Sequence, residues 1–348
     1  MTLAVVLLAA GQGTRMNSRK QKILHEVAGR PMGLHAFLAA EEVADRRPVL
    51  VVGPDERGVP ALIGERAEYV VQPEALGTGH ATRMAESALR GRAEQVIVTY
   101  ADMPLLRAAT LRRLAATQRE SGAAVALLSV AGQPDSTFGR IVRDDSGGVI
   151  EIVEVAEARR RPNAADLLAI TELNAGVYCF DGDWLWANAG RLPIREARRG
   201  REYYLTDLAA MAVEQGRGVA GVMSGDPDEG LGAGTRAEMV AVERAFRRRV
   251  NDHWLAHGVT IIEPDATWIG PDVTIGLDTV IWPNTFLQGR TTIGEDCAIG
   301  PNAIVRDSQV DRGCRVEQVL LDGQRVPDGT TVRPGEWRQP PARQTGAI

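Results

Sequence analysis

The sequence predicts an α/β protein in which a doubly wound, mostly parallel sheet is followed by a short left-handed parallel β-helix. Two observations predict this fold. In the first two thirds of the 348 residues, short apolar runs alternate with stretches of helical length, as in sheets that helices cover on both faces. In the last third, aliphatic residues recur every six positions, which is the period of a parallel β-helix.

The sheet and its helices are expected to occupy residues 1–230. The expected strands are the apolar segments at 5–10, 49–52, 69–72, 95–100, 124–130 and 177–180. Segments of helical pattern lie between several of them, for example at 31–42 and 79–89. Glycine, aspartate and proline then gather at 225–234, and this composition marks the end of the first domain.

A connecting helix is expected over residues 235–257. Thr235 and Glu238 have the spacing of a capping box, in which both side chains satisfy free backbone N–H groups. Apolar residues then recur three and four positions apart, as in an amphipathic helix. They are Met239, Val242, Phe246, Val250 and Trp254. His253 and His257 lie one turn apart, but no third ligand is nearby, so we expect no metal site there.

The β-helix is expected over residues 259–335. The aliphatic residues at six-residue intervals are Ile269, Ile275, Ile281, Leu287, Ile293, Ile299 and Val305. The fourth residue after each of them is usually compact, as a narrow coil requires. The phase then slips, and Val310, Val316, Val326 and Val332 predict one or two less regular coils. The remaining residues, 336–348, are expected to be a frayed tail.

Composition excludes several classes of protein. The formal net charge of −5 argues against a nucleic-acid binder, which would usually carry a basic face. No run approaches the roughly 20 apolar residues of a membrane-spanning helix, and the N-terminus lacks the basic start of a signal peptide. Cys179, Cys297 and Cys314 are too few and too far apart for a disulfide framework or a zinc cluster. We therefore expect a cytoplasmic protein with free thiols and no membrane partner.

A glycine-rich turn follows the first expected strand. Gly11 and Gly13 allow the backbone to approach a ligand, and successive N–H groups there can bind an anion. Arg15 and Lys22 add two cations within reach of the same place. The turn lacks the third glycine of a dinucleotide fingerprint and the Lys-Ser/Thr of a phosphate loop, so it suggests triphosphate binding by another route. The basic run at 159–161 is interpreted as a solvated loop rather than a phosphate clamp.

Short motifs spread over about residues 1–250 form a specific set. After the opening turn they are KILH at 22–25, GRPM at 29–32, QPEALGTGHA at 72–81, YADMPL at 100–105, FGRI at 138–141, IVE at 152–154, NAG at 174–176 and EYYLTD at 202–207. In order and rough spacing this set resembles the sugar-1-phosphate nucleotidyltransferases. The closest resemblance is to the pyrophosphorylase part of the bacterial bifunctional enzyme that makes UDP-N-acetylglucosamine.

The resemblance implies an Mg²⁺-dependent reaction in which UTP and N-acetylglucosamine-1-phosphate give UDP-N-acetylglucosamine and pyrophosphate. Arg15 and Lys22 would neutralise charge on the phosphates, and Asp102 would bind the metal ion. The nucleotide would be held by Leu8, Ala9, Ala10, Gly11, Gln72, Gly77, Thr78 and Tyr100. Gly139, Glu154 and Asn174 would hydrogen-bond the sugar.

Departures from the family pattern leave alternatives open. Gly234 stands where the family has an Asn as its second metal ligand, and Asp226, Asp228 or Glu229 could substitute from just upstream. Other departures are Gln21, Ala101, Val155 and Ala156, the last two in the implied sugar pocket. The alternatives are therefore a pyrophosphorylase for another sugar-1-phosphate or nucleotide, and a non-catalytic protein that binds nucleotide sugars.

The repeat region departs from the family in one further respect. The bifunctional members carry an acetyltransferase whose catalytic histidine lies on a longer β-helix. All five histidines of this chain lie at or before His257, so the repeat has no such general base. We expect no acetyltransferase activity, and we expect the repeat to assemble the chain into a homotrimer.

Overall fold

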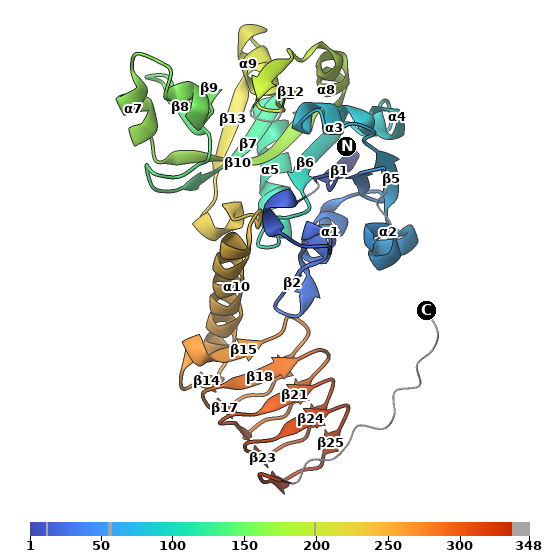
Figure 1. The fold of residues 1–348 in the computed structure, drawn as a ribbon, viewed down its shortest axis with the longest axis vertical. Coiled ribbons are helices and arrows are strands. Elements are labelled where there is room, and N and C mark those ends of the chain that lie inside the picture. The colour runs from blue at the N-terminus through green and yellow to red at the C-terminus, as the bar shows by residue number, and fades with distance from the viewer. Residues whose placement is uncertain (12, 55–57, 198–199, 336–348) are drawn as a thin grey trace. The chain divides into compact units, whose positions relative to one another are not determined.

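The computed structural model describes residues 1–11, 13–54, 58–197 and 200–335 and divides the chain into two compact units (Figure 1). Unit 1 comprises residues 1–25 and 30–242, and unit 2 comprises residues 26–29 and the chain from Glu243 onward. The expected tail at 336–348 and Gln12 of the opening turn lie outside the described residues.

The main sheet of unit 1 is mostly parallel, which confirms the predicted fold class. Its strand order is β13-β7-β10-β6-β1-β4-β5. The strands are β1 (Leu3–Leu8), β4 (Val49–Val52), β5 (Glu68–Val71), β6 (Gln95–Tyr100), β7 (Val125–Ala131), β10 (Glu172–Asp181) and β13 (Val219–Met223). The chain runs from β1 through β4 to β5 on one side and then returns to β6 on the other side of β1. Such a switch point is where doubly wound sheets bind their ligands.

Helices pack on both faces of this sheet, because successive strand side chains point to opposite faces. α1 (Met32–Val43) packs against β1 and against α5 (Ala108–Ser121). A separate core cluster joins alternate strand residues, such as Val6, Val96 and Val98, to four other helices. These are α3 (Thr78–Met84), α4 (Glu86–Leu89), α8 (Gly182–Asn188) and α9 (Asp207–Glu214). The helix predicted at 79–89 is thus two helices, which meet at Ala85.

The sequence pattern misses part of the sheet. β10 is longer than the predicted strand at 177–180, and a bulge between Asn174 and Tyr178 interrupts its pairing with β7. The residues before the bulge are partly polar, so they show no apolar run. The remaining described α-helices and strands of this part of the chain are β2 (Glu26–Val27), β3 (Arg30–Pro31), α2 (Gly58–Ile63), β8 (Arg140–Arg143), β9 (Val149–Val153), α6 (Val155–Ala158), α7 (Ala164–Ala169), β11 (Arg195–Ala197) and β12 (Gly200–Glu202).

Unit 2 is built from the later turns of α10 (Arg236–Ala256) and a parallel β-helix of three sheets (Figure 1). The first sheet contains β14 (Thr260–Ile261), β17 (Val280–Ile281), β20 (Ala298–Ile299), β23 (Arg315–Val316) and β26 (Thr331–Val332). The second contains β15 (Thr267–Ile269), β18 (Thr285–Gln288), β21 (Ile304–Arg306) and β24 (Leu320–Asp322). The third contains β16 (Thr274–Ile275), β19 (Thr292–Ile293), β22 (Gln309–Val310) and β25 (Arg325–Val326).

The six-residue repeat sets the register of this β-helix. Ile275 pairs with Ile293, eighteen positions on, which is three hexads per coil. Ile293 then pairs with Val310, seventeen positions on, and Val310 with Val326, sixteen positions on. The coils therefore shorten where the sequence predicts a slip in phase. The repeated aliphatic side chains stack inside, and Leu287 is fully buried.

Short polar residues allow the β-helix to turn its corners. Asp278, Asn284 and Asp296 have φ values of 59°, 56° and 57°, a left-handed conformation that Asn and Asp tolerate better than other non-glycine residues. The compact residues inside the coil also satisfy the backbone. Oγ1 of Thr279 donates to the carbonyl of Gly294 at 2.8 Å, so a buried hydroxyl stabilises the stack instead of opposing it.

The structure supplies two further observations on the expected class of protein. No helix in the described ranges combines the length and the apolar character that a bilayer crossing requires. Cys179, Cys297 and Cys314 are all buried and free, as the sequence predicts.

Candidate functional site

The opening turn and the Asp102 turn meet at one edge of the unit 1 sheet. Leu8 at the end of β1 is in register with Tyr100 at the end of the parallel strand β6. The N–H of Ala101 donates to the carbonyl of Leu8 at 3.1 Å, and the N–H of Ala9 donates to Val51 on the other side at 2.8 Å. The residues from Leu8 to Gly11 and Asp102 therefore follow the carboxyl ends of two neighbouring strands.

Lys22 and Asp102 form an ion pair across 80 positions of the sequence. Nζ of Lys22 donates to Oδ2 of Asp102, and the two side chains are 16% and 20% exposed. The lysine stem crosses directly over Gly13, where a Cβ atom would lie 2.6 Å from Cβ of Lys22. Gly13 also has a φ of 61°. The glycine turn thus makes room for the cation as well as for a ligand.

The segment Gly232–Gly234 lies against both Asp102 and Arg15. The N–H of Ala233 donates to the carbonyl of Asp102 at 3.2 Å. A Cβ atom on Gly234 would lie 2.5 Å from a terminal nitrogen of Arg15 and 3.0 Å from Oε2 of Glu238. Half of the predicted capping box is present, because Oγ1 of Thr235 accepts from the N–H of Glu238 at 3.1 Å. Oε2 of Glu238 accepts from the N–H of Gly234 at 2.7 Å, one residue before the Thr235 N–H that a capping box would use. One short segment therefore connects the candidate metal ligand and a candidate phosphate-binding cation.

Arg236, which the sequence analysis does not select, braces the loop that carries Arg15. Its Nε donates to the carbonyl of Met16 at 3.3 Å, and its Nη1 lies 3.3 Å from Nδ1 of His25. Burial and the positive charge of Arg236 lower the pKa of His25, which favours a neutral imidazole able to accept that hydrogen bond. No local pattern could have indicated this contact, which joins residues more than 200 positions apart.

Two of the three carboxylates expected as substitute metal ligands, Asp226 and Glu229, are engaged elsewhere. Oδ2 of Asp226 pairs with Arg107 at 2.6 Å, and its Oδ1 accepts from the N–H of Asp228. Glu229 is 2% exposed, and its Oε1 accepts from Thr110 at 3.0 Å. Within the described ranges, no group of three or more His, Cys, Asp or Glu side chains is placed to hold a metal ion. Asp102 is therefore the expected ligand that the structure leaves beside the opening turn.

The residues expected to bind the base lie in a network around the start of α3. Gln72 is buried, and its Nε2 donates to the carbonyl of Gly77 at 3.1 Å. Gly77 has a φ of 93°, and a Cβ atom there would lie 2.6 Å from the carbonyl oxygen of Tyr203. Thr78 accepts from the N–H of Leu205 at 3.1 Å. These contacts hold Gln72, Gly77 and Thr78 in one fixed arrangement.

Tyr100 and Asn174 are joined through the bulge of β10. A Cβ atom on Gly176 would lie 2.7 Å from the ring of Tyr100, so the ring requires a glycine there. Oδ1 of Asn174 accepts from the N–H of Gly176, and Nδ2 of Asn174 donates to the hydroxyl of Tyr178 at 2.7 Å. Burial, with the charges of Asp102 and Glu154, raises the pKa of Tyr100 well above its ordinary value. Tyr100 is therefore a neutral donor and acceptor in this site.

Gly139 and Glu154 lie side by side on the β8–β9 arm. A Cβ atom on Gly139 would lie 3.5 Å from Oε1 of Glu154. The adjacent Arg140 is fully buried and donates to backbone carbonyls at Pro134, Ser136 and Phe138, so it fixes the loop that precedes Gly139. Burial is the main cause that raises the pKa of Glu154, and the charges of Glu157 and Asp207 add to it.

The raised pKa of Glu154 gives a stability prediction. An acid whose pKa is higher in the folded than in the unfolded chain destabilises the fold once it ionises, and this cost is absent below the ordinary value of 4.5. We expect Glu154→Gln to raise Tm above that of the parent at pH 8, with the difference vanishing as the pH falls below 4.5. Differential scanning calorimetry across this range measures it. A variant that is less stable than the parent at pH 8 would contradict the prediction.

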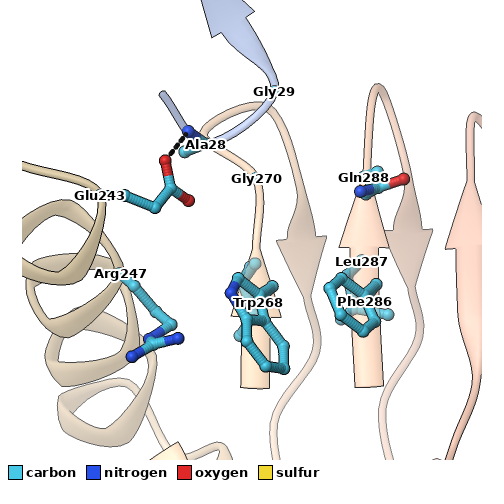
Figure 2. A pocket seen from close by; sticks show the side chains of 10 residues that line it. Ala28, Gly29, Glu243, Arg247, Trp268, Gly270, Phe286, Leu287 and Gln288 are labelled. Carbon is cyan, nitrogen blue, oxygen red and sulfur yellow. Dashed lines mark hydrogen bonds between the residues drawn. The ribbon is translucent and has the colours of Figure 1, made fainter. Parts of the chain in front are cut away.

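A separate cavity of about 230 Å³ lies in unit 2 (Figure 2). The rings of Trp268 and Phe286 stack with centroids 4.3 Å apart, and the guanidinium of Arg247 lies 5.0 Å from the centroid of Trp268. Glu243 reaches the turn between the paired strands β2 and β3, where its Oε2 accepts from the N–H of Ala28 at 2.7 Å. None of the expected site residues lines this cavity, so it is distinct from the site in unit 1.

Known proteins match most of the chain. Residues 5–185 match the family of MobA-like NTP transferase domains. The bifunctional protein GlmU of Exiguobacterium sibiricum is 39% identical over 329 residues, which are 94% of this chain and 72% of that protein. The proteins of the same name from Shouchella clausii and Latilactobacillus sakei are 37% and 35% identical, over 94% and 97% of this chain and 71% of each relative. The chain therefore belongs to the MobA-like NTP transferases and, among them, to the family of the bifunctional GlmU proteins.

Proposed function

We propose that the chain catalyses uridylyl transfer from UTP to N-acetylglucosamine-1-phosphate, giving UDP-N-acetylglucosamine and pyrophosphate. The observation that carries this proposal is the pairing of Lys22 with Asp102 at the end of β6, beside the glycine turn that follows β1. Membership of the NTP transferases and the likeness to proteins named GlmU support the reaction type.

The reaction needs charge stabilisation and positioning more than a covalent nucleophile. A phosphate oxygen of the sugar phosphate attacks the α-phosphorus of UTP, one P–O bond forms, and the bond to pyrophosphate breaks. Negative charge moves onto the leaving pyrophosphate. Arg15 and Lys22, which lie on the same loop, are the cations that would neutralise it.

Asp102 fits a divalent cation as its carboxylate ligand. Mg²⁺ is usually bound through one or two carboxylates together with substrate phosphates, so one aspartate beside a triphosphate site is a sufficient donor set. Gly234 contributes no side chain, and Asp226 and Glu229 are engaged with Arg107 and Thr110. When bound, Mg²⁺ supplies positive charge between the reacting phosphates.

The remaining site residues are assigned to the two substrates. The turn formed by Leu8, Ala9, Ala10 and Gly11 would approach the nucleotide through its backbone, and Gln72, Gly77, Thr78 and Tyr100 would bind the base. Gly139, Glu154 and Asn174 would contact the sugar hydroxyls. The support for this division is that Asn174 and Gly139 are hydrogen-bonded through their backbones at 2.9 Å, while Gln72 and Gly77 share a separate contact.

Pyrophosphate release with a panel of nucleoside triphosphates and sugar-1-phosphates tests the proposal. Turnover should be largest with UTP and N-acetylglucosamine-1-phosphate and should require Mg²⁺. Preference for another pair would instead indicate a pyrophosphorylase for a different sugar or nucleotide. This alternative is considered because Val155 and Ala156 depart from the family pattern in the implied sugar pocket. Tight binding of nucleotide sugars without turnover would select a non-catalytic binding protein.

The β-helix is proposed to assemble the chain as a homotrimer and to lack acetyltransferase activity. Its second sheet carries an outward ladder of half-buried apolar residues, namely Trp268, Phe286, Ile304 and Leu320. Such a ladder is suited to burial against another copy. Light scattering would measure the assembly, and assay of the pure protein with glucosamine-1-phosphate and acetyl-CoA would test the absence of acetylation.

A further inference from the structure

We infer that Glu238 is a second carboxylate of the nucleotide site and would face the divalent cation together with Asp102. This inference rests on the proposed function and extends it, because no motif or comparison selects Glu238 for the site. It starts from the space around Gly234, where a side chain is missing and two charged groups from other positions gather.

The heteroatoms of Arg15 and Glu238 fill the volume that a side chain at position 234 would occupy. A Cβ atom on Gly234 would be 2.5 Å from a terminal nitrogen of Arg15 and 3.0 Å from Oε2 of Glu238. These two distances are close to the distance between Cβ and the polar atom within a short polar side chain. Because Gly234 has no side chain, the carboxylate of Glu238 and the guanidinium of Arg15 can occupy space that the side chain of any other residue would take.

Glu238 is held in that place by the backbone of the same segment. Its Oε2 accepts from the N–H of Gly234 at 2.7 Å, and its own N–H donates to Thr235. The segment continues to Asp102, whose carbonyl accepts from Ala233 and whose carboxylate carbon would lie 3.9 Å from a Cβ on Gly232. Glu238 and Asp102 thus flank three consecutive residues.

The site then contains two cations, each beside a carboxylate. Lys22 is paired with Asp102, and Arg15 lies beside Glu238. The phosphates of a nucleoside triphosphate would compete for Lys22 and Arg15, because phosphate oxygens accept strongly from both side chains. Asp102 and Glu238 would then lose the cations beside them, and each carboxylate would be left without a counter-charge. A divalent cation bound with the triphosphate meets this need.

Metal binding by Glu238→Gln tests the inference, because glutamine can still accept the hydrogen bond from Gly234. The probe is Mn²⁺, titrated in the presence of UTP and followed by the electron paramagnetic resonance signal of the free ion. We expect Mn²⁺ affinity to fall about 10-fold or more, as is typical when a group that serves a metal site is removed. Affinity for UTP measured calorimetrically in EDTA should be unchanged or higher. Glu238→Asp, which keeps the charge, should lose less Mn²⁺ affinity.

Glu243→Gln is the matched control. Glu243 lies on the same helix as Glu238, and its substitution removes the same charge. Like Glu238, it accepts from a backbone N–H at 2.7 Å, and glutamine can still accept that hydrogen bond. The Mn²⁺ affinity of Glu243→Gln should equal that of the parent. Equal Mn²⁺ affinity of Glu238→Gln and the parent would overturn the inference and leave Glu238 as a helix cap. Failure of the parent to bind UTP at all would overturn the proposed function, and the inference with it.

Discussion

Asp102→Asn is expected to lower kcat/KM for pyrophosphate release by about 1000-fold or more, the upper range for loss of one charge-stabilising group in an active site. The substitution keeps the size of the side chain and removes its charge. It withdraws the candidate metal ligand and leaves Lys22 without its carboxylate partner. Because a lysine freed of its ion pair can bind phosphate more readily, UTP should bind the variant at least as tightly as the parent when EDTA is present. Steady-state kinetics and calorimetric titration with UTP measure the two effects.

Asp144→Asn is the control for Asp102. Asp144 lies in the turn between β8 and β9, and its carboxylate accepts from Ser146 and Gly148 within that turn. This variant loses the same charge at an exposed position, so kcat/KM should change little. Activity of Asp102→Asn within 10-fold of the parent would contradict the assignment of Asp102.

Lys22→Met is expected to lower kcat/KM by about 100- to 1000-fold, the range for removing one donor aimed at charge that develops during reaction. The methionine can follow the same path over Gly13 but carries no charge. The double variant with Asp102→Asn should lose less than the product of the two single losses, because the two side chains contact each other. The same pyrophosphate assay, applied to all three variants, completes the cycle.

Lys20→Met tests whether charge alone explains the loss. Lys20 is exposed, lies two positions from Lys22 and changes the net charge of the same loop equally. Its kcat/KM should remain close to that of the parent. If both lysine variants lost activity to the same degree, the general charge of the loop would explain the loss, and Lys22 would have no specific role.

The sequence predicts those parts of the fold in which residues at a regular spacing occupy equivalent buried positions. The six-residue spacing from Ile269 to Val305 has this property, because each aliphatic residue occupies the same interior position of successive coils. β4 and β6 also have the predicted bounds, since β4 is a continuous apolar run and β6 contains one at its centre. The β8–β9 arm and the first half of β10 were not predicted, because charged or polar residues interrupt their apolar residues and leave no continuous apolar run.

The sequence predicts individual residues of the candidate site but not the contacts between them. Asp102 follows a buried strand, and Lys22 follows a glycine turn, so each has a local signal. Their contact spans 80 positions and has none. The same holds for Arg236, which binds Met16 and His25, and for Arg15, whose place beside Glu238 depends on the missing side chain at Gly234. Spacing indicates which residue types are present, whereas the sheet topology decides which of them meet.

The decreasing coil length has a consequence for how this solenoid can be lengthened. The pairs Ile269–Leu287 and Leu287–Val305 keep an eighteen-residue interval, whereas Val305–Leu321 spans sixteen. Duplicating residues 269–286 would add one coil of the same length, and the coils on each side would stack against the same interior side chains as before. A copy of residues 305–320 placed between two eighteen-residue coils would be two residues shorter than the coil on each side. Its strands could not stay in register with both neighbours. An engineered variant of this chain should therefore accept added length near α10, in whole multiples of eighteen residues.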